Sequence, residues 1–420
     1  MELINNNQVP EGYKKTEVGV IPEDWETCKL GEAVDFLDEK RKPIKESERA
    51  KMRGIYPYYG ASGIVDYVNN YLFDEELILL GEDGENILSR NTRLAFRVSG
   101  KVWVNNHAHV LKPKIGFDIN FLTEYLESLD YSLYNSGTAQ PKLNQQICQN
   151  IVVVQPLIKE QKAIAQTLSD VDALIASLDK LIAKKRNIKT ATMQQLLTGK
   201  TRLPGFGGDW LEKQIGTEID LLTGYPFPSS KYSDSGIRLL RCSNIKRGVT
   251  NWDEDLIQYW SELTPDLRQY VLDDGDIVVA MDGSLVGRSF AQLSKLDLPA
   301  LLLQRVARIR SDKIDTSYLK EWICSVFFTE HCDSIKTVTA IPHISPEDIR
   351  NFKIKIPATK EEQRAIAQVL SDIDTEITAL EKRRAKTQAI KQGMMQELLT
   401  GRTRLKIEHP DDPITKNSNG

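Results

Sequence analysis

The sequence is poor in the features that mark secreted, metal-stapled or membrane proteins. Its five cysteines are an odd number without a Cys-x-x-Cys pair, so we expect neither a disulfide framework nor a zinc site. The longest apolar runs, such as Leu77–Leu80 and Pro299–Leu303, are far below the roughly 20 residues that span a bilayer. The first residues also lack an apolar stretch suited to a signal peptide. These absences predict a cytoplasmic protein without a membrane partner.

Motifs for common catalytic sites are missing as well. The sequence has no phosphate loop, no Asn/Asp-Pro-Pro-Tyr/Phe loop and no carboxylate pair followed by Glu-x-Lys. Asp282-Gly283-Ser284 lacks the flanking glycines of a serine nucleophile elbow and is interpreted as a tight turn. His107 and His109 are one residue apart without a third ligand nearby in sequence. We therefore predict no catalytic residue and no metal site.

The most informative feature present is an internal repeat. EQKAIAQTLSD at Glu160 returns as EQRAIAQVLSD at Glu362, and LLTGKTRL at Leu196 returns as LLTGRTRL at Leu398, both 202 positions later. Between Glu160 and Leu203, 26 of 44 positions are identical to their partners. Two copies at so long a period indicate a duplicated domain pair rather than a solenoid.

Apolar residues within each repeat step alternately by four and three positions, the 3.5-residue period of a coiled coil. Each repeat predicts a helix of about 38 residues, roughly 57 Å long. Because a whole domain separates them, the sequence leaves open whether the helices pair parallel or antiparallel. Gly393 interrupts only the second helix and predicts a soft point. The expected helix–helix seam consists of Ile164, Leu168, Val171, Ile175, Leu178, Ile182, Ile366, Leu370, Ile373, Ile377 and Leu380.

The segments before the helices share their ends but not their interiors. Both begin near a Pro–Trp segment, Ile21–Trp25 and Leu203–Trp210, and both close with a proline, a β-like run and a second proline. Apolar runs broken by Gly–Asp turns predict strands, and 120–134 and 317–332 predict amphipathic helices. The fold class is therefore α+β. The expected divisions are a recognition domain at 1–158, a helix at 159–203, a second domain at 204–358, a second helix at 359–405 and a disordered tail at 406–420.

On these motifs the chain resembles the specificity subunit of Type I restriction-modification enzymes over essentially its whole length. The resemblance is carried by VGVIPEDWETCKLGE at Val18–Glu32 and by the duplicated EQ-x-AIAQ-x-LSD-x-D and LLTG[KR]TRL motifs. LLGEDGENIL, GKVWVNNHAHVL and GDIVVAMDGSLVGR add to it. A single motif of this kind is weak, whereas the full set at a constant offset is highly specific.

The resemblance implies two target recognition domains that each read one half of a bipartite site in double-stranded DNA. It also implies that the helices set the spacer and bind two methyltransferase subunits, which restriction (translocase–nuclease) subunits then join. S-adenosylmethionine, ATP and magnesium would belong to those partners, with no cofactor in this chain. The chain itself would carry out no catalysis.

The charge distribution bears on how such a chain meets DNA. The two helix segments, 160–203 and 362–405, carry net charges of +4 and +2, which leaves −10 for the rest of a chain whose net charge is −4. Phosphate contacts must then come from local basic loops and from the partner subunits. We expect weak DNA binding by this chain alone.

Base readout favours polar and basic side chains on loops that enter a groove. The candidate loops in the first domain are the Tyr58–Gly63 segment, NNHAH and SGTAQPK, and in the second RCSNIK, the end of GSLVGR and TAIPH. The candidate contact residues are Tyr58, Tyr59, Gly60, Ser62, Gly63, Asn106, His107, Thr138, Gln140 and Lys142, and Arg241, Ser243, Asn244, Lys246, Arg288, Thr339 and His343.

Three alternatives remain at this stage. In the first alternative, the partner subunit is a single fused methyltransferase–nuclease, which the sequence of the partner's gene would reveal. The second is a coiled-coil scaffold that binds only proteins and gives no sequence-dependent DNA protection. The third is a standalone enzyme, which needs an acid or nucleophile cluster that the sequence does not show.

Overall fold

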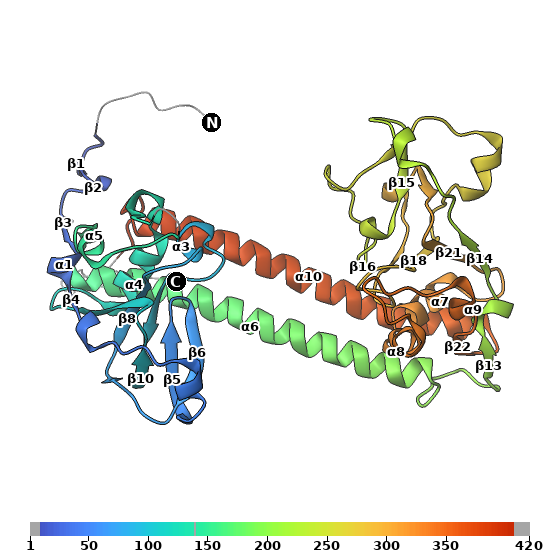
Figure 1. The fold of residues 1–420 in the computed structure, drawn as a ribbon, viewed down its shortest axis with the longest axis horizontal. Coiled ribbons are helices and arrows are strands. Elements are labelled where there is room, and N and C mark those ends of the chain that lie inside the picture. Colours follow the sequence, from blue (N-terminus) through green and yellow to red (C-terminus); the bar gives the residue numbers. More distant parts are fainter. Residues whose placement is uncertain (1–8, 138–139, 407–420) are drawn as a thin grey trace, which may run out of the picture. The chain divides into compact units, whose positions relative to one another are not determined.

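The computed structural model describes residues 9–137 and 140–406. Its contacts divide the chain into two units, 1–179 together with 383–420, and 180–382. Both boundaries fall inside the long helices α6 (Ile158–Leu197) and α10 (Lys360–Leu398). Each unit therefore contains one mixed domain, here called domain 1 (residues 9–157) and domain 2 (residues 198–359), packed on half of each long helix (Figure 1). The expected divisions placed the boundaries at the helix ends instead.

Domain 1 is built around strands whose side chains are largely buried. Every residue of LILLG in β8 is buried, so this strand occupies the middle of the core. Two four-stranded sheets have the orders β6-β5-β10-β7 and β4-β11-β8-β9, and β3 pairs with β12. The strands are β1 (Tyr13–Thr16), β2 (Gly19–Pro22), β3 (Glu26–Lys29), β4 (Val34–Phe36), β5 (Arg53–Gly60), β6 (Gly63–Val68), β7 (Phe73–Asp74), β8 (Leu77–Gly81), β9 (Ala95–Val98), β10 (Lys101–Val104), β11 (Ala108–Pro113) and β12 (Val152–Gln155). The α-helices are α1 (Leu30–Ala33), α2 (Glu46–Arg49), α3 (Asn86–Ser89), α4 (Ile119–Ser128) and α5 (Gln145–Gln149).

Domain 2 repeats this plan with different details. A five-stranded sheet has the order β14-β21-β18-β19-β16, a three-stranded sheet the order β17-β15-β20, and β13 pairs with β22. The β4-β11-β8 core of domain 1 thus corresponds to β14-β21-β18. The parallel pair β5–β10 of domain 1 has a counterpart in β15–β20, and domain 2 has a second parallel pair, β16–β19. The strands are β13 (Leu211–Gln214), β14 (Asp220–Thr223), β15 (Ile237–Leu240), β16 (Arg247–Gly248), β17 (Tyr259–Trp260), β18 (Ile277–Ala280), β19 (Phe290–Gln292), β20 (Ala300–Leu302), β21 (Val306–Arg310) and β22 (Lys353–Ile356). The α-helices are α7 (Thr316–Ile323), α8 (Val326–Ile335) and α9 (Pro346–Arg350).

The mixed α+β class and the long helices are confirmed, but the two shorter amphipathic helices are interrupted. The segment 120–134 forms α4 followed by the 3-10 turn Tyr131–Tyr134, because Asp130 accepts a hydrogen bond from the Ser132 amide and starts a new turn. The segment 317–332 divides into α7 and α8, since the Ser325 side chain caps α8. Polar residues that cap a helix end override a continuous apolar pattern here.

The two long helices run antiparallel where they meet within each unit. In the first unit, Asp172 contacts Lys391 at 2.7 Å and Asp179 contacts Arg384. Residue numbers therefore increase along one helix in the direction in which they decrease along the other. In the second unit, Lys189 contacts Asp374 at 2.6 Å and Arg186 contacts Glu381 at 2.6 Å in the same sense. The sequence left this choice open.

The apolar seam serves two purposes along its length. Ile164 and Leu168 belong to the core of domain 1, and Ile366 and Leu370 to the core of domain 2. Nearer the middle of each helix, Leu178, Ile182 and Ile377 are buried, while Val171, Ile175, Ile373 and Leu380 are half-buried. Each seam therefore begins as part of a domain core and continues as a helix–helix contact. No helix in the described part of the chain is long and apolar enough to cross a membrane.

Candidate nucleic-acid interface

Three sequence-predicted loops of domain 1 meet at the Gly–Asp turn that follows β8. The Glu82 amide donates to the His107 carbonyl at 2.9 Å, and the Leu143 amide donates to the Glu82 carbonyl at 2.7 Å. His107 Nδ1 lies 2.8 Å from Asp83 Oδ2, and Lys142 Nζ lies 3.3 Å from Glu82 Oε1. The Gly60–Gly63 hairpin turn and Asn105 line the same hollow, which has a volume of about 480 Å³. These residues are called site 1.

Domain 2 builds the same arrangement after β18. The Met281 amide donates to the Arg305 carbonyl at 2.9 Å, and the Ile344 amide donates to the Met281 carbonyl at 2.9 Å. The Gly283 amide donates to the Pro342 carbonyl at 3.0 Å, as the Gly84 amide donates to that of Pro141 at 3.1 Å in domain 1. Arg305 Nη1 lies 3.1 Å from Asp282 Oδ2. Asp282, Gly283, Arg305 and the closing loop 337–343 are called site 2.

The predicted contact residues are not equally available at these sites. Ser62, Asn106, His107, Gln140, Lys142, Ser243, Lys246, Thr339 and His343 are exposed, and Tyr59, Gly63, Arg241 and Arg288 are half-buried. Gly60 is buried beside Val65, and Thr138 lies outside the described residues. The structure therefore keeps most of the candidate loops accessible.

Two candidates are buried within their own domain and form hydrogen bonds there instead of facing outward. Tyr58 is 2% exposed, and its hydroxyl accepts from the Ile44 amide at 3.0 Å. Asn244 is 0% exposed, and its side chain accepts from the Arg241 amide and donates to the Asn251 carbonyl, both at 3.0 Å. A side chain buried in this way cannot reach a base edge, so we omit both from the proposed contacts.

Arg288 is accessible but already paired with a carboxylate. Its guanidinium makes a bidentate contact with Asp333, at 3.0 Å for Nη1 and 2.5 Å for Nη2. Hydrogen bonds from Arg288 and Lys336 hold the pKa of Asp333 well below its usual range. Both terminal nitrogens of Arg288 are therefore engaged by Asp333, whereas Arg305 contacts Asp282 through Nη1, which makes Arg288 a weaker candidate for DNA contact than Arg305.

The two histidines considered as a metal pair have different partners. His107 is exposed and faces Asp83, whereas His109 is 1% exposed, with Nδ1 2.6 Å from Asp38 and Nε2 2.8 Å from the Leu143 carbonyl. Burial alone would lower the pKa of His109, but hydrogen bonds with Asp38 and Cys148 outweigh it and raise this pKa to about 10.

His109, Asp38 and Glu82 form a compact group, with one ligand-type atom of each within 4.8 Å of the others. Arg41 already contacts both carboxylates, at 3.3 Å for Asp38 and 2.6 Å for Glu82. Because each histidine nitrogen faces an acceptor and a guanidinium neutralises the acids, the group suits an ion-pair network better than a metal site. The network fixes the base of site 1.

The duplicated motifs join the start of each long helix to the end of the other through an ion pair, here called a helix clasp. Arg404, which follows α10, contacts Glu160 at the start of α6, with Nη2 2.8 Å from Oε2. Arg202, which follows α6, contacts Glu362 at the start of α10, with Nη2 2.6 Å from Oε2. Both glutamates are 1% exposed. The Glu of EQ and the Arg of TRL are therefore repeated for a structural reason, because each buried glutamate is neutralised by the arginine from the other copy of the motif.

The neighbouring glutamines attach each domain to its helix. Gln161 accepts from the Asp118 amide, and Gln363 accepts from the Asp315 amide, both at 2.8 Å. Asp118 and Asp315 are the N-caps of α4 and α7. The glutamines also donate to the carbonyls of the prolines that precede the long helices. One motif thus fixes the domain, the incoming strand and the helix start together.

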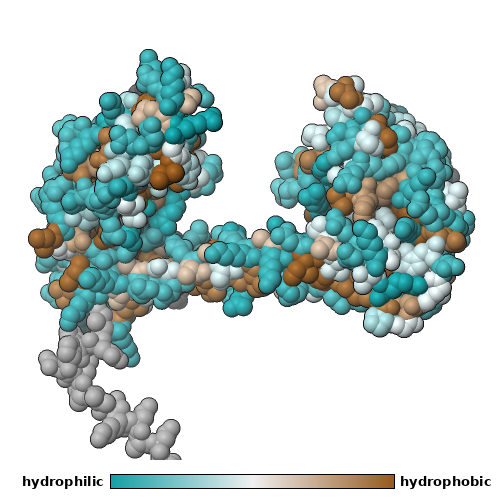
Figure 2. All heavy atoms as spheres, turned by 90° about the horizontal axis from the view of Figure 1, so that it is seen from below, coloured by the Kyte–Doolittle hydropathy of each residue, from teal (hydrophilic) through white to brown (hydrophobic). Residues whose placement is uncertain are grey.

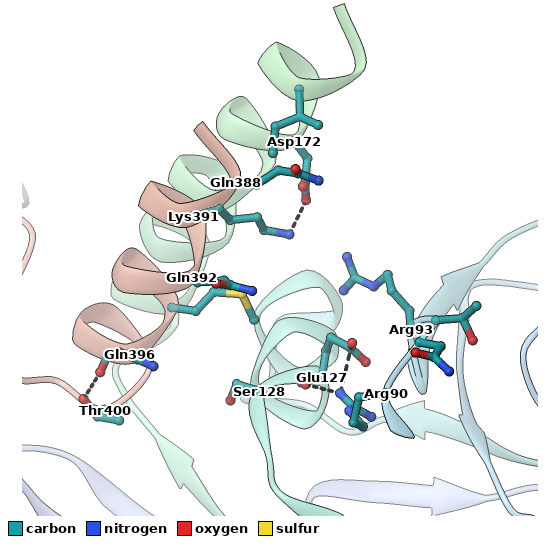
Figure 3. Close-up of a pocket in the computed structure, with 14 residues that line it drawn as sticks. Arg90, Arg93, Glu127, Ser128, Asp172, Gln388, Lys391, Gln392, Gln396 and Thr400 are labelled. Carbon is teal, nitrogen blue, oxygen red and sulfur yellow. Dashed lines mark hydrogen bonds and ion pairs between the residues drawn. The ribbon is translucent and has the colours of Figure 1, made fainter. Parts of the chain in front are cut away.

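A groove lined mostly by polar residues lies between residues 90–93, α4 and the long helices in the first unit (Figure 3). It has a volume of about 840 Å³, and Gln388, Gln392 and Gln396 line it from α10. Lys391 crosses its edge to reach Asp172 at 2.7 Å and Glu124 at 3.2 Å. Figure 2 shows hydrophilic side chains over much of the visible face of both domains.

Sequence reasoning missed Arg305, the cation of site 2. Gln304-Arg305 lies between two buried strands, β20 and β21, without a turn motif to draw attention to it. Its place becomes visible only when β11 and β21 are superimposed as equivalent strands, because His107 precedes β11 as Arg305 precedes β21.

The geometry defines a class of protein: two related α+β domains, each with a polar turn-and-loop site, joined through clasped antiparallel helices. A family model described as the Type I restriction modification DNA specificity domain matches residues 22–185 and 223–392. The chain belongs to this family.

Individual relatives agree with this assignment. The chain is 28% identical to the Type I restriction enzyme MjaVIII specificity subunit of Methanocaldococcus jannaschii, with 97% of this chain and 99% of the relative covered. It is 34% identical to the EcoAI specificity subunit of Escherichia coli, over 40% of this chain and 29% of that one.

A solved structure supports the fold. The S subunit of a Type I restriction-modification system from M. genitalium matches with a TM-score of 0.57 at 14% identity, covering 94% of this chain and 98% of the other. The architecture is therefore shared far beyond recognisable sequence similarity.

Proposed function

We propose that this chain is the sequence-reading subunit of a Type I restriction-modification complex, in which each domain reads one half of a bipartite DNA target. The observation that carries the proposal is the repetition of one polar site in both domains. An Asp-Gly turn, a histidine or arginine before the neighbouring strand of the sheet, and a proline-containing closing loop meet through equivalent backbone hydrogen bonds in sites 1 and 2. Divergent side chains on a constant frame suit two readers of different sequences.

The exposed composition near these sites suits a DNA groove. Polar candidates such as Ser62, Asn106 and His343 supply donors and acceptors for base edges. Val65 is 57% exposed beside site 1, and Ile341 is 66% exposed in the closing loop of site 2. Apolar side chains of this kind contact thymine methyl groups. Both kinds of readout are therefore available in each domain.

Stable binding requires more positive charge than the two domains supply. Outside the helix segments the chain carries a net charge of −10, whereas nonspecific DNA affinity depends on cations that neutralise phosphates. We propose that two methyltransferase subunits dock on the long helices and provide most phosphate contacts, and that restriction subunits then join. The methyl transfer and cleavage, with S-adenosylmethionine, ATP and magnesium, would belong to those partners.

The direct test is co-expression with the neighbouring methyltransferase subunit in a host without adenine methylation. N6-methyladenine is then mapped across the genome at single-base resolution. The expected result is methylation at one split motif, two short half-sites around a constant spacer. The methyltransferase subunit expressed without this chain is the control and should give no such motif.

A stable complex that leaves the genome unmarked and protects no DNA sequence would favour a protein-only scaffold. A partner that proves to be one fused methyltransferase–nuclease would change the composition of the complex but not the role proposed for this chain. The two results are separable, because the first concerns DNA and the second only the partner's sequence.

A further inference from the structure

Arg305 occupies in domain 2 the position that His107 occupies in domain 1. Each residue precedes an inner strand of its sheet, β21 or β11. Each accepts through its carbonyl a hydrogen bond from the residue just before the turn aspartate, Met281 or Glu82, at 2.9 Å in both cases. Each side chain then contacts that aspartate, Asp282 or Asp83. The agreement of backbone and side-chain contacts shows that His107 and Arg305 occupy equivalent positions.

The backbone at Arg305 is held in an unfavourable conformation. Its φ is +70°, in the left-handed region that residues with a side chain rarely adopt. Two donors hold it there, the Met281 amide and the Cys242 thiol, both at 2.9 Å from the Arg305 carbonyl. Glycine would adopt this conformation without cost. Such strain is found where the surroundings fix a side chain for a purpose.

Within the described part of the chain, the Arg305 guanidinium is paired with Asp282 through one nitrogen, which leaves its other N–H donors available. Only Nη1 contacts Asp282 among the described residues, at 3.2 Å from Oδ1 and 3.1 Å from Oδ2. The Arg305 side chain is 60% exposed, against 24% for that of Asp282. An arginine has five N–H donors, so most of them remain available for a ligand. The aspartate therefore orients the side chain without consuming its binding capacity.

We propose that Arg305 reads a guanine in the half-site of domain 2, oriented by Asp282 as a positioning residue; this rests on the proposed function. A guanidinium donates two parallel hydrogen bonds to guanine O6 and N7 in the major groove, the commonest specific contact in protein–DNA complexes. An ammonium cannot reproduce that fork. His107 offers a different donor at the equivalent position, so the two domains differ in the base that this position selects.

The test uses the complex with the methyltransferase subunit and two substitutions. Arg305→Gly removes the side chain and fits φ +70°, so the fold is retained. Arg305→Lys keeps the charge. Genome-wide methylation and binding to target duplexes should show, for both variants, a loss of selectivity at one G·C pair of the second half-site. Binding to the intact target should fall about 10- to 100-fold, while the first half-site remains unchanged.

The matched control is Arg350→Ala. The Arg350 side chain is 40% exposed and also contacts a carboxylate, that of Glu347 at 3.6 Å, but it lies in α9 of domain 2, outside site 2 and the long helices. It should leave the methylated motif unchanged. Replacing the selected guanine by 7-deazaguanine should weaken wild-type binding but not that of Arg305→Gly.

Two outcomes would overturn the proposal. An unaltered motif and unaltered selectivity with Arg305→Gly would show that the side chain reads nothing. Full activity of Arg305→Lys, with only a uniform loss for Arg305→Gly, would reduce Arg305 to a phosphate contact. A wild-type complex that methylates no split motif would instead refute the proposed function itself.

Discussion

At the scale of single residues, the buried His109–Asp38 pair makes a prediction about pH. Its pKa, raised from 6.5 to about 10, means that the folded protein holds the proton more tightly than the unfolded chain. This stabilisation is fully present below pH 6.5 and is lost as the pH rises through about 10. We expect His109→Gln to destabilise domain 1 by roughly 3 kcal/mol at pH 6, because Asp38 loses a buried partner.

The measurement is the unfolding free energy of wild type and variant at several pH values. The difference in unfolding free energy between wild type and variant should become smaller as the pH rises from neutral towards 10. His107→Gln, which alters an exposed imidazole 50% open to solvent, is the control and should change stability little. A gap that stays constant with pH would contradict a protonated His109.

A second residue-scale prediction concerns two glycines, Gly393 within α10 and Gly401 just after it. A methyl group at Gly393 meets nothing within 4 Å, so Gly393→Ala should stabilise the protein by about 1 kcal/mol through helix propensity. Gly401 has φ +70° and its added Cβ would lie 2.4 Å from Pro22. Gly401→Ala should therefore destabilise domain 1 by more than that amount. Thermal unfolding of both variants checks the opposite signs.

Residue roles were the hardest feature to predict from sequence. Polar and aromatic loop residues were taken as contacts by type, yet Tyr58 and Asn244 point into the domains. Whether such a side chain faces inward depends on strand register and on long-range hydrogen bonds, such as that of Tyr58 with Ile44. Arg305 was missed because its equivalence to His107 is a property of the folded sheets and not of sequence similarity.

At the scale of elements, the helix clasps predict domain-specific destabilisation. Arg404→Ala leaves the buried Glu160 without its cation, and Arg202→Ala does the same to Glu362. Each should cost roughly 2 kcal/mol, below the full value of a buried pair because the arginines are partly exposed. Arg404→Ala should lower the unfolding temperature of the first unit, and Arg202→Ala that of the second.

Hydrogen exchange resolved along the chain would assign each loss to its unit. Arg384→Ala is the matched control, since it breaks an exposed helix–helix ion pair with Asp179 whose partners are 37% and 48% accessible. Exposed pairs contribute about 0–1 kcal/mol. Equal losses in both units from Arg404→Ala would contradict a local clasp.

Elements themselves followed closely from the sequence. The uninterrupted apolar period places α6 and α10 within a few residues of their observed ends, and Gly199 and Gly401 end both with positive φ. Antiparallel pairing was not predictable, because an apolar seam fits either direction and the deciding ion pairs join residues 185 and 219 positions apart.

At the scale of the whole molecule, the first unit is assembled from two distant segments of chain. Residues 383–406 add Leu398, Leu399 and Met395 to the core of domain 1, and Arg404 neutralises Glu160. We expect a chain ending at residue 382 to lose cooperative unfolding of the first unit while the second, whose residues are contiguous, keeps its own transition. Calorimetry of the shortened and full chains tests this, and loss of both transitions would contradict it.

The contact between Arg404 and Glu160 also bears on the order in which the two units can fold during synthesis. Domains fold as their residues leave the ribosome, so the contiguous second unit can complete its core before the first, although domain 1 is translated earlier. Domain 1 must wait, with part of its apolar surface uncovered, until the end of α10 arrives. A prematurely terminated chain would then present an incomplete domain 1 to proteases and chaperones.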